Sequence, residues 1–243
     1  MIYEQYRNNP VAFAKEILGL TLHKKQVEIS DAIVEGPRVA APTTYSGGST
    51  TLAAALTLWW VSSRYPGLAA NTAPTPRELK NLLWRRIRRL HAAADLPGEV
   101  KVRSWDLVPD RCFAMGFVGG CQGHDLEEQL QKLSQSQNML LIEDAMGGAP
   151  GELPADLELH PTSRHLKIGK PMAASASPGW IAIRVTAFDT PNLDPFGQQP
   201  IPGLVDPEWV ELMRRRYGEQ SSVWRVRVLA ELPKAEDQGA VDA

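Results

Sequence analysis

A short glycine loop near the start of the chain carries the first residues with a recognisable chemistry. Residues 39–42 are apolar and predict a short strand, which leads through Gly47 and Gly48 into an apolar helix that begins near Thr50. A strand, a tight loop and a helix N-terminus in this order can bind an anion, because backbone N–H groups point at it. We therefore expect Gly47, Gly48, Ser49 and Thr50 to contact the phosphates of a nucleotide.

This loop lacks the lysine that such a site normally uses. Loops of the G-x-x-x-x-G-K-[ST] type place Lys directly after the last glycine, where it reaches the outer phosphates. Ser49 holds that position, residues 43–46 add no cation, and Arg38 lies before the strand. The Thr50 hydroxyl remains as a ligand for Mg²⁺. We expect weak nucleotide binding and inefficient hydrolysis; the alternative is a plain glycine turn that caps a buried helix.

An acidic pair, Glu143 and Asp144, is the second feature with chemical meaning. It directly follows the apolar run 139–142, which predicts a central buried strand. In open α/β sheets, ligands bind outside the carboxyl ends of the strands. The acidic pair and the glycine loop are therefore expected at the same edge of one sheet. The alternative is a solvated acidic pair at a strand end.

The elements around these features predict the fold class. Strands that alternate with helices favour an α/β fold with a largely parallel sheet. We predict a three-layer sandwich with a mostly parallel central sheet. The expected helices span residues 10–18, 23–34, 50–63, 76–94, 126–133 and 206–217, and the expected strands after 39–42 span residues 68–73, 100–105, 112–118, 139–142, 166–168 and 180–188.

Composition narrows the class of protein. The chain has 243 residues, 43% of them apolar, and a formal net charge of −2. This composition fits a soluble domain with a sizeable core and gives no overall attraction to nucleic acid. The polar N-terminus does not read as a signal peptide, and no apolar run reaches the roughly 18 residues of a membrane span. Cys112 and Cys121 match neither a disulfide framework nor a metal site, which predicts a reducing, intracellular setting.

Several short sequence segments, taken in their order along the chain, resemble the ATPase domain of the large terminase subunit of tailed bacteriophages, the motor that pumps DNA into procapsids. The resemblance covers residues 9–233 and implies a P-loop NTPase fold of the ASCE (RecA-like) type. In that family a nuclease domain follows the ATPase domain, and the chain ends about where it would begin, so no nuclease activity is expected. The segments are LHKKQVEI (22–29), LAAALTLWW (52–60), TAPT (72–75), LWRRIRRLH (83–91), AFDTPN (187–192), PGLVDPEWV (202–210) and RVRVLAELP (225–233).

The resemblance and the composition of the C-terminus together predict three parts of the chain. Residues 1–36 would form an N-terminal helical adaptor segment, residues 37–233 the terminase-like ATPase domain, and residues 234–243 an acidic flexible tail.

The acidic pair matches the Walker B position of the family. The family has Asp followed by Glu at this position, and this chain has the reverse order, Glu143 followed by Asp144. By the resemblance Glu143 would hold Mg²⁺ together with Thr50, and Asp144 would orient the attacking water. Glu143 is one methylene longer, and Asp144 one shorter, than the residue expected at its place. A displacement near 1 Å can lower a rate about 100-fold, so the inversion predicts impaired catalysis.

The coupling motif of the family ends in Gly-Asn-Pro, and this chain has Gly169, Lys170 and Pro171 instead. Lys170 thus replaces the amide of that motif. The loop, the acidic pair and the coupling motif are all altered, while the scaffold segments remain. This combination favours a pseudo-ATPase over a chance match.

Three further roles follow from the resemblance or from charge. Gln26 matches a position that reads adenine in related motors, and Arg111 would act as an arginine finger on a neighbouring subunit. Arg85, Arg89 and Arg215 belong to basic runs that would contact DNA phosphates. For each of these residues, a solvated position on the surface is the alternative.

Together these features predict a terminase-like ATPase domain of viral DNA-packaging machinery whose ATP hydrolysis is impaired or lost. Two other interpretations stay open: an active packaging ATPase split from its nuclease, and a structural or regulatory module that caps or competes for a motor ring. The expected cofactors are weakly bound ATP and Mg²⁺. The expected partners are double-stranded DNA, the portal, other terminase subunits and further copies in a ring, in the host cytoplasm or on the procapsid portal and away from membranes.

Overall fold

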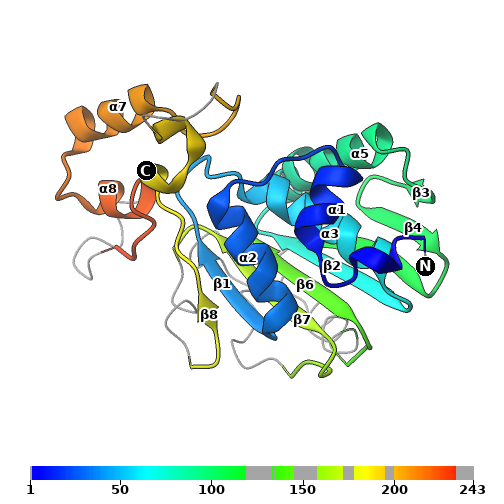
Figure 1. Cartoon of the computed structure of the whole chain (residues 1–243). Helices are drawn as coiled ribbons and strands as arrows, with labels where there is room; N and C mark the ends of the chain where they lie inside the picture. Colours follow the sequence, from blue (N-terminus) through cyan, green and yellow to red (C-terminus); the bar gives the residue numbers. More distant parts are fainter. Residues whose placement is uncertain are drawn as a thin grey trace.

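The computed structural model describes residues 2–118, 133, 135–144, 158–171, 178–194 and 200–233. In this part of the chain, eight strands form one sheet in the order β3-β4-β5-β2-β6-β7-β1-β8 (Figure 1). The strands are β1 (Arg38–Pro42), β2 (Gly67–Ala73), β3 (Glu99–Val100), β4 (Ser104–Val108), β5 (Cys112–Val118), β6 (Met139–Asp144), β7 (Arg164–Gly169) and β8 (Ile181–Ala182). The helices are α1 (Pro10–Glu16), α2 (Lys24–Glu35), α3 (Ser49–Ser63), α4 (Pro76–Glu78), α5 (Trp84–Ala93), α7 (Pro207–Tyr217) and α8 (Ser222–Arg227).

The sheet is parallel over most of its width. Strands β5, β2, β6, β7, β1 and β8 pair in parallel, and β4 and β3 continue the sheet in antiparallel pairing at one side. Central parallel strands are buried on both faces and therefore read as unbroken apolar runs. Residues Met139 to Ile142 of β6 are at most 1% exposed. The predicted α/β fold with a mostly parallel sheet is confirmed.

Helices α1, α2, α3 and α5 cover one face of the sheet (Figure 1). Helix α3 is enclosed there between the sheet and its neighbouring helices, which explains why it is apolar on nearly every side. Its two adjacent tryptophans, Trp59 and Trp60, are 0% and 1% exposed. This large core fixes the helix that follows the glycine loop.

Successive side chains of each strand point to opposite faces of the sheet. On β6, Leu140 and Ile142 pack into the core under α3, whereas Met139 and Leu141 belong to a second apolar cluster on the other face. Leu133, Leu159 and other partly buried residues pack against that second cluster. The complete third layer of the sandwich stays a prediction, because it would involve residues outside the described part.

A smaller core beside the carboxyl edge of the sheet unites α7 and α8 (Figure 1). Val210 and Met213 of α7 pack there with Trp224 of α8. The Asp206 carboxylate accepts a hydrogen bond from the backbone N–H of Trp209 at 2.8 Å and so caps α7, as the sequence predicts. Trp209 stacks on Tyr45, and the N–H of Val205 donates to Ser46 O at 3.1 Å, so this unit stands next to the glycine loop.

Three expected elements differ in detail. The helix over 76–94 is interrupted by a π-helical turn, η2 (Leu79–Leu83), which adds a residue to the turn and buries both Leu83 and Trp84. The expected strand over 100–105 is divided between β3, which ends at Val100, and β4, which begins at Ser104; residues 101–103 form a turn closed by a hydrogen bond from Lys101 N–H to Ser104 O at 2.7 Å.

The third difference concerns the strand over 180–188. It is reduced to β8 because Thr186 and Asp189 form a capping box that turns the chain into a 3-10 helix.

The N-terminal helices share the main core. Phe13 and Ile33 are both 0% exposed within it, so the proposed boundary between residues 36 and 37 stays a prediction. Apart from Leu133, the expected helix 126–133 lies outside the described residues, as do the tail 234–243 and Cys121. Cys112 is a buried free thiol.

Candidate functional site

The glycine loop and the acidic pair lie at the same edge of the sheet. Pro42 at the end of β1 pairs with Gly169 of β7, and Asp144 at the end of β6 pairs with Ile168 of the same strand. The carboxyl ends of β1, β7 and β6 are therefore adjacent, with β7 between the other two. This is the edge at which an α/β sheet binds its ligand.

The first half of the loop is held by hydrogen bonds within the chain. The backbone N–H groups of Thr43, Thr44 and Tyr45 donate to the carbonyl oxygens of Gly169, Val185 and Arg227 at 2.6, 2.8 and 3.1 Å. The N–H of Gly47 donates to Thr44 O at 3.2 Å. Four amides that could face a phosphate are thus already engaged.

The second half of the loop is different. Gly48 has a φ of +86° and begins α3 without a side-chain cap. The N–H groups in the first turn of a helix have no intrahelical partner, so they are the natural donors for an anion. The backbone N–H groups of this loop that are available to an anion therefore lie between Gly48 and Thr51.

Helix α2 braces the loop from the side. The Gln26 side chain accepts a hydrogen bond from His23 N–H and donates one to Gly48 O, both at 3.1 Å. The Nε2 atom of His23 lies 3.3 Å from Gly47 O, and burial lowers the pKa of His23, which keeps its ring neutral. Gln26 thus supports the shape of the loop, and its adenine-reading role stays a prediction.

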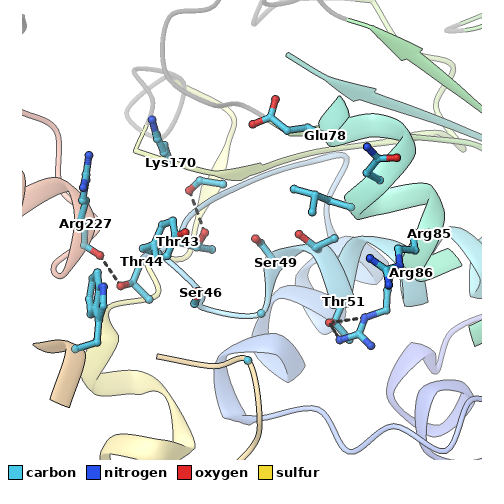
Figure 2. Close-up of a pocket in the computed structure, with 18 of the residues that line it drawn as sticks. Thr43, Thr44, Ser46, Ser49, Thr51, Glu78, Arg85, Arg86, Lys170 and Arg227 are labelled. Atoms are coloured by element: carbon cyan, nitrogen blue, oxygen red, sulfur yellow. Dashed lines mark hydrogen bonds between the residues drawn. The ribbon is translucent and has the colours of Figure 1, made fainter. Parts of the chain in front are cut away.

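A cavity of about 890 Å³ opens at the loop (Figure 2). Its walls come from residues 43–51, from the segment 78–89, from the end of β7 and from α7 and α8. Among the residues that the structure describes, five cationic side chains and one carboxylate, that of Glu78, line it. The cations are Arg85, Arg86, Arg89, Lys170 and Arg227. A chain with a slight negative net charge therefore concentrates positive charge at this cavity, which favours an anionic ligand.

The arginines of α5 divide between the cavity and the outer surface. Arg86 donates from Nε and Nη2 to the Thr51 hydroxyl at 3.1 and 2.9 Å. Arg85 and Arg89 also line the cavity, whereas Arg88 donates to the Val102 carbonyl at 2.6 Å on the far side of the helix. The DNA-contact role of Arg85 and Arg89 stays a prediction.

Sequence reasoning missed both Arg86 and Glu78 as cavity residues. Helical spacing gives a signal for the first, because residues 85, 86 and 89 lie on one side of a helix. For Glu78 the signal is the pattern Thr-x-x-Glu from Thr75, which forms the cap of α4.

Glu143 lies in a buried polar cluster on the sheet face opposite α3. Its Oε2 atom is 3.1 Å from Nε2 of His165 and 3.4 Å from Nζ of Lys167, and the three side chains are at most 5% exposed. The ring of Trp180 lies over both partners. Burial is the main cause that lowers the pKa of His165, and the Glu143 carboxylate opposes this shift.

The remaining predicted residues are spread over the molecule. Asp144 ends β6, but its side chain lies outside the described part. Gly169 and Lys170 line the cavity, and Pro171 follows them directly. Arg111 precedes β5 at the amino edge of the sheet, away from the loop of its own chain; a finger role in a neighbouring subunit stays a prediction.

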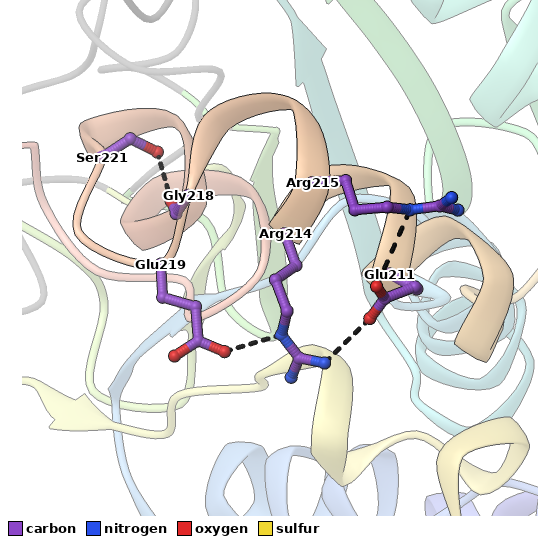
Figure 3. A network of polar contacts seen from close by, with 6 residues as sticks. All are labelled: Glu211, Arg214, Arg215, Gly218, Glu219 and Ser221. Atoms are coloured by element: carbon purple, nitrogen blue, oxygen red, sulfur yellow. Dashed lines mark hydrogen bonds and ion pairs between the residues drawn. The ribbon is translucent and has the colours of Figure 1, made fainter.

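The basic run on α7 is paired with acids. Arg215 lies 3.7 Å from Glu211, and Arg214 contacts Glu211 at 2.8 Å and Glu219 at 2.7 Å (Figure 3). The Arg215 side chain is 71% exposed. Its contact with DNA stays a prediction.

Solved structures share this architecture. The ATPase domain of the Thermus phage P74-26 large terminase matches 90% of this chain and 96% of its own length, with a TM-score of 0.59 and 13% identity. The chain has the fold of a large-terminase ATPase domain. The large terminase of a thermophilic bacteriophage matches in complex with ADP (TM-score 0.56, 10% identity, 86% of this chain) and with ATP-γ-S (TM-score 0.52, 12% identity, 86% of this chain).

The chain spans about half the length of that second terminase, 52% in both complexes. Models of protein families give no match to the chain, and curated proteins give none either. In the described residues, no helix is both long and apolar enough to cross a bilayer.

Proposed function

We propose that this chain binds a nucleoside triphosphate in the loop cavity, as the ATPase-type domain of a phage DNA-packaging machine, and that its ATP hydrolysis is impaired or lost. The observation that carries the proposal is the cavity of about 890 Å³, where the first turn of α3 meets five cationic side chains. Its size suits a nucleotide. The large terminase of the thermophilic bacteriophage, which shares the fold, has been seen with ADP and with ATP-γ-S.

Two features support binding without efficient hydrolysis. The helix N-terminus at Gly48 offers backbone donors to phosphate, but Ser49 at the lysine position has no charge to place on the outer phosphates. The Glu143 carboxylate is bonded to His165 and Lys167, which argues against direct coordination of a metal by this residue. Asp144 is then the acid of the pair left to orient water.

Magnesium fits the described residues only in part. The Thr50 hydroxyl lines the cavity and would hold Mg²⁺ together with the phosphates, and the ion would neutralise charge on them. Within the described ranges, no group of three or more His, Cys, Asp or Glu side chains could hold a metal ion. We therefore propose a metal that depends on the nucleotide for most of its ligands.

Titration with ATP-γ-S, followed by calorimetry with and without Mg²⁺, tests binding, and release of phosphate from ATP tests turnover. We expect a dissociation constant near the millimolar range and no turnover in the native chain. Ser49→Lys should tighten binding about tenfold or more, because a charge-assisted contact to phosphate contributes about 1.5–3 kcal/mol. Ser46→Lys is the matched control, since it adds the same charge at another position that lines the cavity.

Steady Mg²⁺-dependent turnover at ordinary motor rates would overturn the claim of impaired hydrolysis and favour an active packaging ATPase. If neither the native chain nor Ser49→Lys bound any nucleotide, the proposed function would be wrong. That result would favour a structural or regulatory module that retains the fold alone.

The proposed setting is the host cytoplasm, with the portal, other terminase subunits and double-stranded DNA as partners and further copies of the chain as neighbours in a ring around the DNA. The shared fold supports this setting. Sedimentation of the chain alone, with the portal and with duplex DNA would test it, and the proposal fails if the chain associates with neither.

A further inference from the structure

The three arginines of α5 that line the cavity, Arg85, Arg86 and Arg89, are here called the α5 arginine cluster. No ion pair in the described part of the chain joins any of them to a carboxylate. Three neighbouring cations on a ten-residue helix repel one another, and an anion between them relieves the repulsion.

The basic run on α7 provides an internal comparison. Its Arg214 and Arg215 are both paired with Glu211, and Arg214 is also paired with Glu219 (Figure 3). Arg214 and Arg215 are thus paired with acids on the protein surface, while Arg216 lies over the ring of Tyr217. The α5 arginine cluster instead faces the loop across the cavity, so the two basic runs differ in what they can bind.

Arg86 is the member of the cluster that donates hydrogen bonds to the first turn of α3. Its guanidinium donates twice to the Thr51 hydroxyl, two residues after Ser49 (Figure 2). A guanidinium carries five N–H groups, so three remain for a ligand after these two bonds. The contact holds a fixed positive charge beside the first turn of α3, where the backbone amides also face the cavity.

We infer that the α5 arginine cluster replaces the loop lysine and binds the outer phosphates of a nucleoside triphosphate, with Arg86 as its anchor. Arginine suits this task because its planar guanidinium can donate two parallel hydrogen bonds to one phosphate. The inference rests on the proposed function for the identity of the ligand. It differs from that function in naming a second element, α5, as the source of the cation.

Binding of inorganic tripolyphosphate and of ATP to the full chain, measured by calorimetry, tests this inference. We expect Arg86→Ala and Arg89→Ala to weaken tripolyphosphate binding about ten- to a hundredfold. Arg88→Ala is the matched control: it removes the same charge from the same helix, but Arg88 contacts the Val102 carbonyl away from the cavity. It should change binding less than about twofold. Unfolding in urea checks that each variant remains folded.

A second variant separates phosphate binding from mere support of α3. Adding Ser49→Lys to Arg86→Ala should restore tripolyphosphate affinity, because it returns the charge to the loop without restoring the Thr51 contact. Failure of this rescue, or equal losses in the Arg86, Arg89 and Arg88 variants, would overturn the inference. So would arginine variants that weaken binding of a short DNA duplex and leave tripolyphosphate binding intact.

The two probes distinguish this inference from the proposed function. Arginine-dependent binding of tripolyphosphate without binding of ATP would support the α5 site and contradict the nucleotide function. Binding of ATP that is indifferent to the arginines would support the nucleotide function and overturn the α5 site.

Discussion

The side-chain amide of Gln26 on α2 donates a hydrogen bond to the carbonyl oxygen of Gly48, the residue from which α3 begins, at 3.1 Å. The same amide accepts from His23 N–H. A residue expected to face a base therefore supports the turn at which the phosphates are expected. This contact makes the shape of the loop depend on a helix more than twenty positions earlier in the chain.

Gln26→Ala should destabilise the fold by about 1–3 kcal/mol, because it leaves the buried N–H of His23 without its partner and removes one of the two hydrogen bonds that the Gly48 carbonyl accepts. The free energy of unfolding in urea measures this change. Gln135→Ala is the control, since exposed Gln135 donates to Glu158 O at 3.3 Å on the surface; it should change stability by less than about 0.5 kcal/mol. If Gln26→Ala removed a preference for ATP over GTP while stability stayed the same, the base-reading role would be correct instead.

Gly48→Ala should destabilise the loop for two separate reasons. The φ of +86° disfavours any side chain, and an added Cβ would lie 2.7 Å from Gln26 Nε2 and 3.2 Å from Leu204 Cδ2. Gly203→Ala isolates the first reason, because its φ is +87° and no atom lies within 4 Å of the added Cβ. We expect about 1–2 kcal/mol for Gly203→Ala and a larger loss for Gly48→Ala. Equal losses at the two positions would contradict the packing of Gln26 against the loop.

Removal of one partner of the buried pair Glu143 and Lys167 should lower the free energy of unfolding strongly, whereas replacement of both by apolar residues should lower it much less. Lys167→Met leaves a carboxylate buried beside His165, and the loss of one partner of such a pair costs about 3–5 kcal/mol. Glu143→Leu combined with Lys167→Met should cost clearly less than the two single changes added together. Chemical denaturation of the three variants gives the comparison. The exposed pair of Lys101 with Asp106 is the control, and Lys101→Met should cost less than about 1 kcal/mol.

Stability should fall as the pH falls below the ordinary pKa of histidine, about 6.5. Burial lowers the pKa of His165 in the folded chain, so the unfolded chain binds the proton first and unfolding becomes easier. The contribution of neutral His165 to the stability of the fold is complete above about pH 6.5 and is lost at lower pH. Glu143 on β6, Lys167 on β7 and Arg38 on β1 are the charged groups that act on this ring.

His165→Asn should flatten the fall in unfolding free energy between about pH 7.5 and 5.5 without abolishing it, since His23 has a lowered pKa of the same sign. A variant whose pH dependence is as steep as that of the native chain would show that His165 does not titrate in this range. Its absolute stability is not the test, because the substitution also removes a contact with Trp180.

The strands and helices of the scaffold are well predicted from the sequence, because each depends mainly on residues that are close together in the chain. The apolar run at 139–142 and the helix after the glycine loop follow directly from burial of central strands and of α3. The π-helical turn at Leu79–Leu83 could not be predicted in this way. It arises where Trp84 must fit against Gly116, whose added Cβ would lie 2.3 Å from the indole nitrogen, and that contact joins distant parts of the chain.

The site is less predictable from sequence, because the order of the strands in the sheet decides which of its residues lie side by side. The acidic pair and the loop could be assigned to one edge from sequence, but the partners of Glu143 could not. His165 and Lys167 reach it because β7 lies beside β6 and alternation brings positions 165 and 167 to the same face. The same limit applies to Arg86, whose contact with Thr51 depends on how α5 packs on α3.

Four N–H groups of the glycine loop donate to carbonyl oxygens of the chain itself, among them Gly169 and Arg227. A loop held by these bonds keeps its course whether or not the cavity is filled. Arrival of a ligand would then move the backbone of the first half of the loop little. Such rigidity suits a fixed binding surface better than a moving part.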